Sequence, residues 1–303
     1  MRIPHPIPYQ GSKRGIAEAI LAYFPQHVAR LVEPFAGSAA VTIAAAAHYR
    51  ADRFWLNDLN EPLMRLWDAI ICQPEQVADA YECLWREQQG RERDYYDMIR
   101  AEFNRTRRPE YLLYLLARCV KASVRYNANG EFNQSPDNRR RGMHPVTMRR
   151  QIVETSRLLR GKTLITAGGY QNVLEKVSSE DIVYMDPPYQ GVCAGRDPRY
   201  YTDINHDELH EWLHYLNARH VAYLLSYDGR NDLRAYGEPL PADLNLMRVE
   251  IYAGRSSQAT LLGIKAYTVE SLYLSPALVD RIGDRRVASD YSQQSQCALL
   301  DLK

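Results

Sequence analysis

Short apolar runs alternate with helical patterns along this chain, and this alternation restricts the fold more than any other feature. The runs lie at residues 31–35, 54–58, 181–186 and 221–226. An alanine-rich stretch follows the first run as far as His48, and apolar residues recur at helical spacing over 61–71. Strands that alternate with helices indicate an α/β fold with a mostly parallel sheet.

Residues able to carry chemistry stand where these predicted strands end. They are residues 35–37, Asp58, Asp186 and Ser226. Parallel strands bring their carboxyl ends to one edge of a sheet, and ligands bind there. We therefore expect these residues to form one site. Further along, Asn205 and Glu208 have the spacing of a capping box and predict the start of a helix.

The size and composition of the chain exclude several classes of protein. Its 303 residues suffice for one large α/β domain with a smaller inserted one. It has no apolar run of about 18 residues, so no membrane span is expected. The five cysteines are odd in number and form no CxxC pair. Neither a disulfide framework nor a metal site is expected, and a cytoplasmic location with reduced thiols fits best.

Residues 100–150 are strongly basic. They contain twelve Lys or Arg against four acidic residues, a net charge of +8 on a chain whose total is +1. Such a segment is typical of a nucleic-acid face, although a solvated basic loop fits equally well. The segment lies in a helical stretch that includes the patterns at 76–85 and 110–120, and 126–143 is rich in Asn, Gly, Pro and Arg. We expect a helical insertion with a basic loop or hairpin.

Two segments near the N-terminus suggest a nucleoside ligand. Gly37 follows the first predicted strand and lets the backbone approach a ligand closely. The loop is not GxGxxG and lacks the lysine of a P-loop, so a pyrophosphate ligand is disfavoured and a simple turn remains an alternative. Asp58 ends the next strand, where an acidic side chain can accept hydrogen bonds from ribose hydroxyls. The segment 57–60 could also cap the helix that begins near Glu61, and one residue could cap while its neighbour binds.

The sequence Asp-Pro-Pro-Tyr at 186–189 stops the third predicted strand. Its prolines stiffen the segment and remove two backbone donors. An exocyclic amine of adenine or cytosine is a poor nucleophile because its lone pair is delocalised into the ring. Asp186 and the Pro187 carbonyl could accept its two N–H bonds while Tyr189 stacks on the base. A loop that methylates such an amine is therefore predicted, with a proline-rich turn as the alternative.

From about residue 8 to residue 276 the chain resembles the Dam-type (alpha-class) adenine-N6-specific DNA methyltransferases. The order of motifs is similar: a cofactor segment, an inserted region, then Asp-Pro-Pro-Tyr. The resemblance implies a Rossmann-like S-adenosylmethionine-dependent methyltransferase sheet with a mainly helical inserted DNA-recognition domain. It divides the chain into a catalytic domain (1–74 and 161–278), a target-recognition domain (75–160) and a tail (279–303).

Three segments carry the cofactor part of this resemblance. Residues 9–13 look like the family's Trp-x-Gly-Gly-Lys, residues 33–38 like Glu-Pro-Phe-x-Gly-x-Gly, and residues 57–60 like Asp-x-Asn. Ala39 replaces the second glycine of the loop, and we expect binding to survive this. The catalytic residues implied are Asp186, Pro187 and Tyr189. The residues implied to bind S-adenosyl-L-methionine are Tyr9, Gly11, Lys13, Glu33, Phe35, Ala36, Gly37, Asp58, Leu59 and Asp186.

The DNA part of the resemblance lies inside the basic stretch. Residues 125–133 are similar to Arg-Tyr-Asn-x-x-Gly-Glu-Phe-Asn, which opens the family's DNA-contacting hairpin. Beyond Gln134 the similarity is lost, so no recognition sequence can be carried over. The resemblance also implies that residues 225–228 line the pocket of the target base. The residues implied to lie at or near DNA are Arg125, Asn127, Asn133, Pro136 and Arg139.

Together these features predict transfer of a methyl group from S-adenosylmethionine to adenine N6 in double-stranded DNA, after the base is flipped out. A cytosine-N4 methyltransferase and a non-catalytic DNA-binding protein on the same fold are the alternatives. Intact Lys13, Asp58 and Asp186 argue against the second. We expect a monomer, with a cognate restriction nuclease as a candidate partner.

Overall fold

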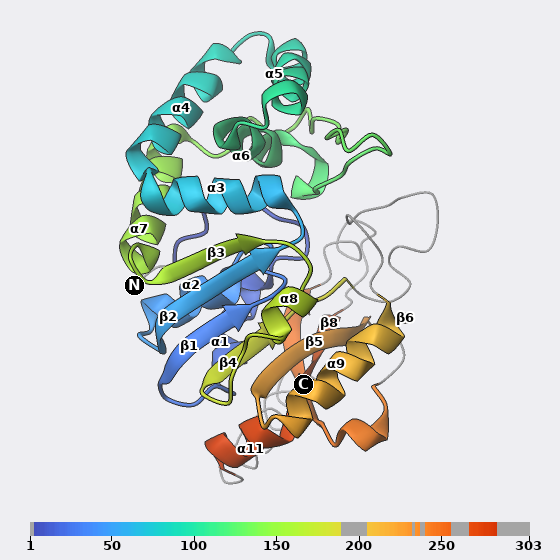
Figure 1. Ribbon diagram of the computed structural model, residues 1–303. Coiled ribbons are helices and arrows are strands. Elements are labelled where there is room, and N and C mark those ends of the chain that lie inside the picture. The colour runs from blue at the N-terminus through green and yellow to red at the C-terminus, as the bar shows by residue number, and fades with distance from the viewer. Residues whose placement is uncertain (1–2, 189–204, 232–233, 237–239, 256–266, 284–303) are drawn as a thin grey trace, which may run out of the picture.

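A mostly parallel sheet forms the centre of the protein. The computed structural model describes residues 3–188, 205–231, 234–236, 240–255 and 267–283 (Figure 1). The sheet of this described part has eight strands. In spatial order, seven of them are β3 (Thr163–Ala167), β2 (Ala51–Asp58), β1 (Val28–Glu33), β4 (Asp181–Met185), β5 (Ala222–Asn231), β8 (Tyr267–Leu274) and β7 (Met247–Arg255). The eighth, β6 (Arg234–Tyr236), pairs with β5.

The direction of the strands confirms the predicted fold class. The strands from β3 to β5 pair in parallel. β8 lies antiparallel between β5 and β7, and β6 is also antiparallel. From β1 the chain proceeds outward through β2 and β3, then returns to place β4 on the other side of β1. The sheet therefore has its topological switch point between β1 and β4, where ligands bind in open α/β sheets.

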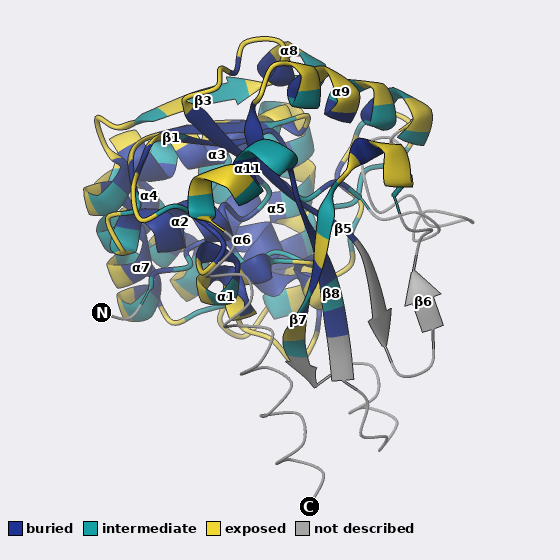
Figure 2. Ribbon diagram, turned by 90° about the horizontal axis from the view of Figure 1, so that it is seen from below, coloured by how far each residue is buried: buried dark blue, intermediate teal, exposed yellow. Residues whose placement is uncertain are grey.

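Helices cover both faces of the sheet, which explains its nearly continuous apolar strands. Every residue of β4 is buried. Successive residues of β1 point to opposite faces, since Leu31 and Val32 belong to two different apolar clusters. Figure 2 shows the buried strands between helices with exposed outer sides. One face carries α1 (Ala17–Leu21), α2 (Ala40–Ala47), α3 (Glu61–Cys72) and α11 (Pro276–Ile282), and the other carries α8 (Gln171–Leu174) and α9 (His206–Ala218).

A helical region packs on α3, above the sheet in Figure 1. The patterns at 76–85 and 110–120 are confirmed as helices, and two further helices were not predicted. Proline occupies the first turn of three of the four, a position that lacks a hydrogen-bond partner in any case. The helices are α4 (Pro74–Glu87), α5 (Glu92–Thr106), α6 (Pro109–Arg118) and α7 (Pro145–Leu159). The assignment of residues 75–160 to a separate domain stays a prediction.

The helical region leaves the sheet and returns to it at neighbouring points. The Ser156 hydroxyl near the end of α7 donates a hydrogen bond to the Ile71 carbonyl near the end of α3, at 2.6 Å. The Arg160 guanidinium donates to the carbonyl of Cys72. The two ends of the region are therefore bonded to each other at its base.

Residues 125–133 form a hairpin on this helical region. Tyr126 and Phe132 pair as an antiparallel bridge, and the Asn133 amide donates to the Arg125 carbonyl at 3.0 Å. The described residues also contain three short 3-10 helices: η1 (Lys13–Gly15), η2 (Val120–Ala122) and η3 (Ala242–Leu244). None of the helices in the described parts of the chain has the length and apolar character needed to cross a membrane.

Candidate functional site

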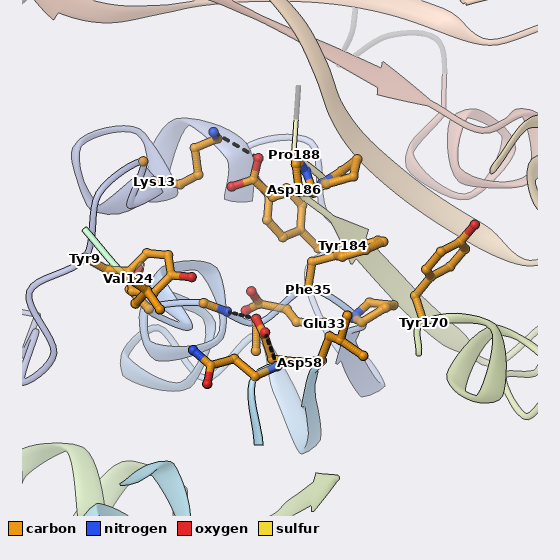
Figure 3. A pocket seen from close by; sticks show the side chains of 18 of the residues that line it. Tyr9, Lys13, Glu33, Phe35, Asp58, Val124, Tyr170, Tyr184, Asp186 and Pro188 are labelled. Atoms are coloured by element: carbon orange, nitrogen blue, oxygen red, sulfur yellow. Dashed lines mark hydrogen bonds and ion pairs between the residues drawn. The ribbon is translucent and has the colours of Figure 1, made fainter. Parts of the chain in front are cut away.

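A pocket of about 390 Å³ opens at the carboxyl ends of β1, β2 and β4. Figure 3 shows Glu33, Asp58 and Asp186 around it, one from each strand end. Every residue predicted to bind the cofactor lines this pocket, and so does Pro187. Tyr189 lies outside the described residues. The alternation of strands and helices thus brings together three segments that are far apart in the sequence.

The loop between β1 and α2 depends on a left-handed backbone at two residues. Gly37 has a φ of 46°, and a Cβ added to it would lie 3.2 Å from the Tyr9 ring. A side chain at position 37 would therefore displace Tyr9. Ala39 has a φ of 47°. Glycine takes this conformation freely, whereas alanine pays roughly 1–2 kcal/mol, so the loop keeps its shape at a modest cost.

Asp58, at the end of the neighbouring strand β2, holds this loop in place by a hydrogen bond. One carboxylate oxygen accepts a hydrogen bond from the Gly37 amide at 3.0 Å, and the other accepts from the Asn60 amide at 2.9 Å. Burial raises the pKa of Asp58, and these two hydrogen bonds oppose the rise. Asn60, whose side chain accepts from the Leu63 amide, is the residue that caps α3. The segment 57–60 thus provides the cap through Asn60 while Asp58 lines the pocket, so the two roles coexist.

Glu33 is buried at the end of β1. Its carboxyl accepts a hydrogen bond from the Thr42 amide at 2.6 Å. Burial raises the pKa of Glu33 to about 8, the hydrogen bonds with Thr42 oppose the rise, and the charge of Asp186 adds to it. Burial therefore favours the neutral form of the Glu33 carboxyl.

This buried carboxyl gives a testable pH dependence of stability. Below the ordinary pKa of 4.5, Glu33 is protonated both folded and unfolded. As the pH rises from there to about 8, Glu33 ionises in the unfolded chain but not in the folded one, so the wild-type protein loses stability. Glu33→Gln has no carboxyl at this position and does not lose this stability. We expect the variant to be more stable by roughly 2–4 kcal/mol at pH 8 and unchanged near pH 4. Calorimetric unfolding at both pH values measures this.

An exposed glutamate provides the control for this experiment. Glu180 is exposed, in the turn before β4. Glu180→Gln should leave the unfolding temperature nearly unchanged at either pH. An equal gain from Glu33→Gln at pH 4 and pH 8 would show that the gain does not come from ionisation.

Asp186 follows β4 and is paired with Lys13. The Lys13 ammonium lies 2.9 Å from a carboxylate oxygen of Asp186 and 3.2 Å from one of Glu270 on β8. Burial raises the pKa of Asp186 to about 6; Lys13 opposes the rise and the charge of Glu270 adds to it. Glu270 was not predicted. The signal for it in the sequence is a single acidic residue within an apolar run, at 267–274.

At the far end of the pocket, the predicted Phe35 is joined by residues that the sequence did not indicate as parts of the site. The rings of Phe35 and Tyr170 lie 5.1 Å apart and are tilted by 34°. The amide of Gln171 donates to the Glu208 carboxylate at 2.8 Å. Tyr170, Gln171 and Glu208 all line the pocket. These aromatic and hydrogen-bonding groups could hold a flat heteroaromatic ring.

The predicted capping box at α9 is half correct. The Asn205 side chain accepts from the amides of Asp207 and Glu208, at 3.1 and 3.3 Å, so the cap is confirmed. The carboxylate of Glu208 does not complete the box, because it accepts from Gln171 of α8 instead. A contact between two helices thus replaces the local one that the spacing predicted.

Ser226 lies beside the pocket and does not line it. Its hydroxyl is 3.0 Å from the Tyr184 hydroxyl, and both side chains are buried. Tyr184 is the residue that faces the pocket. The expectation that all four strand ends meet there holds for three of them.

The residues predicted to lie at DNA are on the hairpin and the loop after it, and none lines the pocket. Asn133 and Arg139 are exposed, whereas Arg125, Asn127 and Pro136 are partly buried. The Asn127 side chain shapes the tip of the hairpin: its oxygen accepts from the amides of Asn129 and Glu131, and its nitrogen donates to the Glu131 carboxylate.

Part of the basic stretch is neutralised by acids outside it. Arg149 pairs with three carboxylates of α4, those of Glu75, Asp79 and Glu82. Arg100 pairs with Asp97, which precedes the basic stretch and belongs to the same helix, α5. Arg139, Arg140 and Arg141 are neighbouring exposed side chains; the first two pair with the buried Asp137, and Arg141 lies 3.9 Å from Glu92 of α5. We call residues 139–141 the arginine cluster, and it is the most concentrated positive charge of the stretch.

The hairpin and the residues just before it contact the pocket or the residues that line it. Val124 lines the pocket. The Tyr126 hydroxyl donates to the side-chain oxygen of Asn60 at 3.1 Å, and the Gln10 amide donates to the Ala122 carbonyl at 3.0 Å. The basic hairpin and the pocket are therefore parts of one continuous structure.

The Rossmann-like sheet with a pocket at its switch point is the fold expected of an S-adenosylmethionine-dependent methyltransferase, and the family match below assigns the chain to that class. The model of the D12 class N6 adenine-specific DNA methyltransferases matches residues 9–250, and the chain belongs to this family. The resemblance noted from the motifs is thereby confirmed.

Individual relatives are similar over part of their length. The Retron Ec67 DNA adenine methylase of Escherichia coli is 30% identical, over 64% of this chain and 65% of that protein. The type II methyltransferase M.MjaIII of Methanocaldococcus jannaschii is 24% identical, over 66% and 74%. The DNA N-6-adenine-methyltransferase of Escherichia phage P1 is 27% identical, over 60% and 23%. The chain thus spans less than two thirds of the first and third of these relatives.

Proposed function

We propose that this protein transfers a methyl group from S-adenosylmethionine to N6 of adenine in duplex DNA. One observation carries the proposal: Asp186 and Pro187 border the same pocket as Asp58, at the switch point between β1 and β4. The acceptor for an exocyclic amine and the acceptor for ribose hydroxyls are therefore neighbours. Family membership supports adenine as the target.

The pocket fits the proposed cofactor. Its volume of about 390 Å³ lies within the range of small-molecule sites. Each carboxylate oxygen of Asp58 accepts one backbone amide and keeps further acceptor capacity for a ribose hydroxyl. Phe35 and Tyr170 provide aromatic surface for an adenine ring. When bound, S-adenosylmethionine supplies a methyl group on a positively charged sulfur. Glu33 and Lys13, which line the pocket, would hold its methionine portion.

Asp186 and Pro187 would prepare the target nitrogen. The amino group is paired and unreachable inside the duplex, so the base has to rotate out. The Asp186 carboxylate and the Pro187 carbonyl would accept its two N–H bonds and favour a more nucleophilic, tetrahedral nitrogen. We propose that Tyr189 stacks on the base. The nitrogen becomes acidic as it gains the methyl group, and Asp186, ionised above about pH 6, can accept the departing proton.

We propose that the hairpin and the arginine cluster dock the DNA. Exposed arginines bind phosphates and position the duplex, whereas contacts to base edges provide sequence specificity. Arg125, Asn133, Pro136 and Arg139 are the proposed contact residues. Asn127 would act through the shape of the hairpin tip, because its side chain is engaged there.

Replacing Arg125 tests the DNA side of the proposal. We expect Arg125→Ala to weaken DNA binding about tenfold or to relax the site preference, because a contact to phosphate or base is lost. Cofactor affinity should stay unchanged. Anisotropy with labelled duplexes and calorimetry with the cofactor measure the two affinities.

The control for Arg125→Ala is Arg53→Ala, which removes an exposed arginine from β2. That variant should bind DNA as the wild type does. Unchanged DNA affinity and site preference in Arg125→Ala would remove Arg125 from the proposed interface.

Methylation of random-sequence DNA tests the function as a whole. After reaction with labelled cofactor, mass analysis of the digested nucleosides identifies the product, and sequencing of the modified positions gives the recognition site. N6-methyladenine is the expected product. N4-methylcytosine would instead establish the cytosine activity, and DNA binding without any methyl transfer would establish a non-catalytic role.

We also propose a cytoplasmic monomer that acts on double-stranded DNA with S-adenosyl-L-methionine as its cofactor. The name of one relative, a type II methyltransferase, supports a restriction nuclease as partner. Light scattering of the purified protein, with and without a DNA duplex, tests the monomer.

A further inference from the structure

The ammonium group of Lys13 lies between two carboxylates from different parts of the sheet. Lys13 belongs to η1, and its Nζ is 2.9 Å from Asp186 Oδ1 and 3.2 Å from Glu270 Oε2. Only 8% of the lysine side chain is exposed. Figure 3 shows Lys13 and Asp186 pointing toward each other. Both ion pairs are therefore largely shielded from water, where charge interactions are stronger than at the surface.

The antiparallel strand β8 brings Glu270 to this site. Glu270 pairs in register with Gly229 of β5 and Ile251 of β7. The neighbouring residue Ser271 pairs with Glu250 of β7. Because side chains alternate along a strand, Glu250 and Glu270 lie on opposite faces of the sheet. Of these two glutamates, Glu270 lies on the face of the sheet where Lys13 is found.

Two carboxylates share one cation, and this has a chemical consequence. An ammonium held by Asp186 alone would occupy the oxygens that the proposed function assigns to the target amine. Glu270 gives Lys13 a second partner at nearly the same distance. Lys13 can therefore stay paired inside the protein while Asp186 accepts hydrogen bonds from a base. Without Glu270, releasing Asp186 would leave a buried charge unpaired, which is costly.

We propose that Glu270 is a positioning residue of the methyl-transfer site: it holds Lys13 and so keeps the Asp186 carboxylate available to the target amine. This inference rests on the proposed function. It adds to the site a residue that lies in the sequence more than 80 positions after Asp186, outside the segments that resemble the family's motifs.

Glu270→Gln tests the inference, because the amide keeps the shape of the side chain and removes its charge. We expect the single-turnover rate of methyl transfer to fall about 10- to 100-fold. The dissociation constants of cofactor and DNA should stay within about threefold of the wild type. Glu270→Asp, which keeps the charge, should recover part of the lost rate.

A second readout does not depend on activity. Among the described residues, the ionisable groups near Asp186 are Lys13 of η1, Glu270 of β8 and Glu33 of β1. The charge of Glu270 raises the pKa of Asp186, and that of Lys13 lowers it. In Glu270→Gln, Lys13 acts on Asp186 alone, so the midpoint of Asp186 moves from about 6 to lower pH. Carbon-13 NMR of labelled aspartates, assigned with Asp186→Asn, measures this midpoint in the free protein.

Glu250→Gln is the matched control, on the opposite face of the sheet. It should keep the wild-type rate and the wild-type midpoint of Asp186. Glu270→Gln with an unchanged rate and an unchanged midpoint would overturn the inference. So would a loss of cofactor affinity in proportion to the rate, because Glu270 would then be a cofactor-binding group.

The two levels of the proposal fail in different ways. A wild-type protein that methylates no DNA contradicts the proposed function. Even in that case, a lower midpoint of Asp186 in Glu270→Gln than in the wild type would show that Glu270 and Asp186 share Lys13. An active wild type with an unmoved midpoint in Glu270→Gln contradicts the further inference alone.

Discussion

Replacing Asp186 with alanine is expected to slow methyl transfer by roughly 1000-fold, the loss that follows removal of one preorganised transition-state contact. The carboxylate is the group placed to accept hydrogen bonds from the target amine at the border of the pocket. DNA affinity should change little, because the proposed phosphate contacts come from the hairpin and the arginine cluster, which do not include Asp186. Single-turnover transfer of labelled methyl groups and anisotropy with a duplex measure the two effects.

The ion pairs around Asp186 make this variant interpretable. Lys13 keeps Glu270 as a partner, so the buried ammonium is not left alone and the fold should persist. Asp186→Asn keeps the shape without the charge and should also be nearly inactive. Asp280→Asn, at an exposed residue of α11, is the control and should match the wild type. Full activity of Asp186→Ala would end its assignment as a catalytic residue.

Asp58→Asn is expected to weaken cofactor binding about 100-fold. The Asp58 carboxylate accepts from the amides of Gly37 and Asn60 while facing the pocket. An amide nitrogen in place of one oxygen would oppose one of these donors and lose a charge-assisted bond to a ribose hydroxyl. Hydrogen bonds to charged groups contribute about 1.5–3 kcal/mol each, which corresponds to the expected change. Titration calorimetry with S-adenosylmethionine measures it.

An exposed aspartate is the matched control for Asp58→Asn. Asp243 of η3 has 69% of its side chain exposed, and Asp243→Asn should bind the cofactor normally. DNA affinity of Asp58→Asn in the absence of cofactor should also stay near the wild-type value. An unchanged cofactor affinity would mean that the pocket holds its nucleoside in another way, or holds another ligand.

The sequence was sufficient for those parts of the site that depend on single strands and their ends. β1, β2, β4 and β5 are apolar runs, and a parallel sheet brings their carboxyl ends together. Asp58 and Asp186 could thus be predicted to be neighbours. β3 was missed because it is an edge strand with no fully buried residue, so it lacks the apolar run of the others.

The remaining features depend on partners that are distant in the sequence. Glu270 reaches Lys13 only because β8 lies antiparallel beside β5. Glu208 bonds to Gln171 of another helix instead of closing its own cap. The charge of the basic stretch is lowered because α4 places acids beside Arg149. Local spacing carries no information about such pairings.

The hydrogen bonds at the base of the helical region have a consequence for how a protein of this kind can change. Ser156 bonds to Ile71 and Arg160 to Cys72, so the chain enters and leaves the region at adjoining points. We expect that such a region could be replaced as a cassette by that of a homologue without changing the order of strands in the sheet. A transplanted cassette would have to keep the hydrogen bond of Tyr126 to Asn60. Under the proposed function, in which this region contacts DNA, such an exchange would change the recognised sequence and leave the pocket in place.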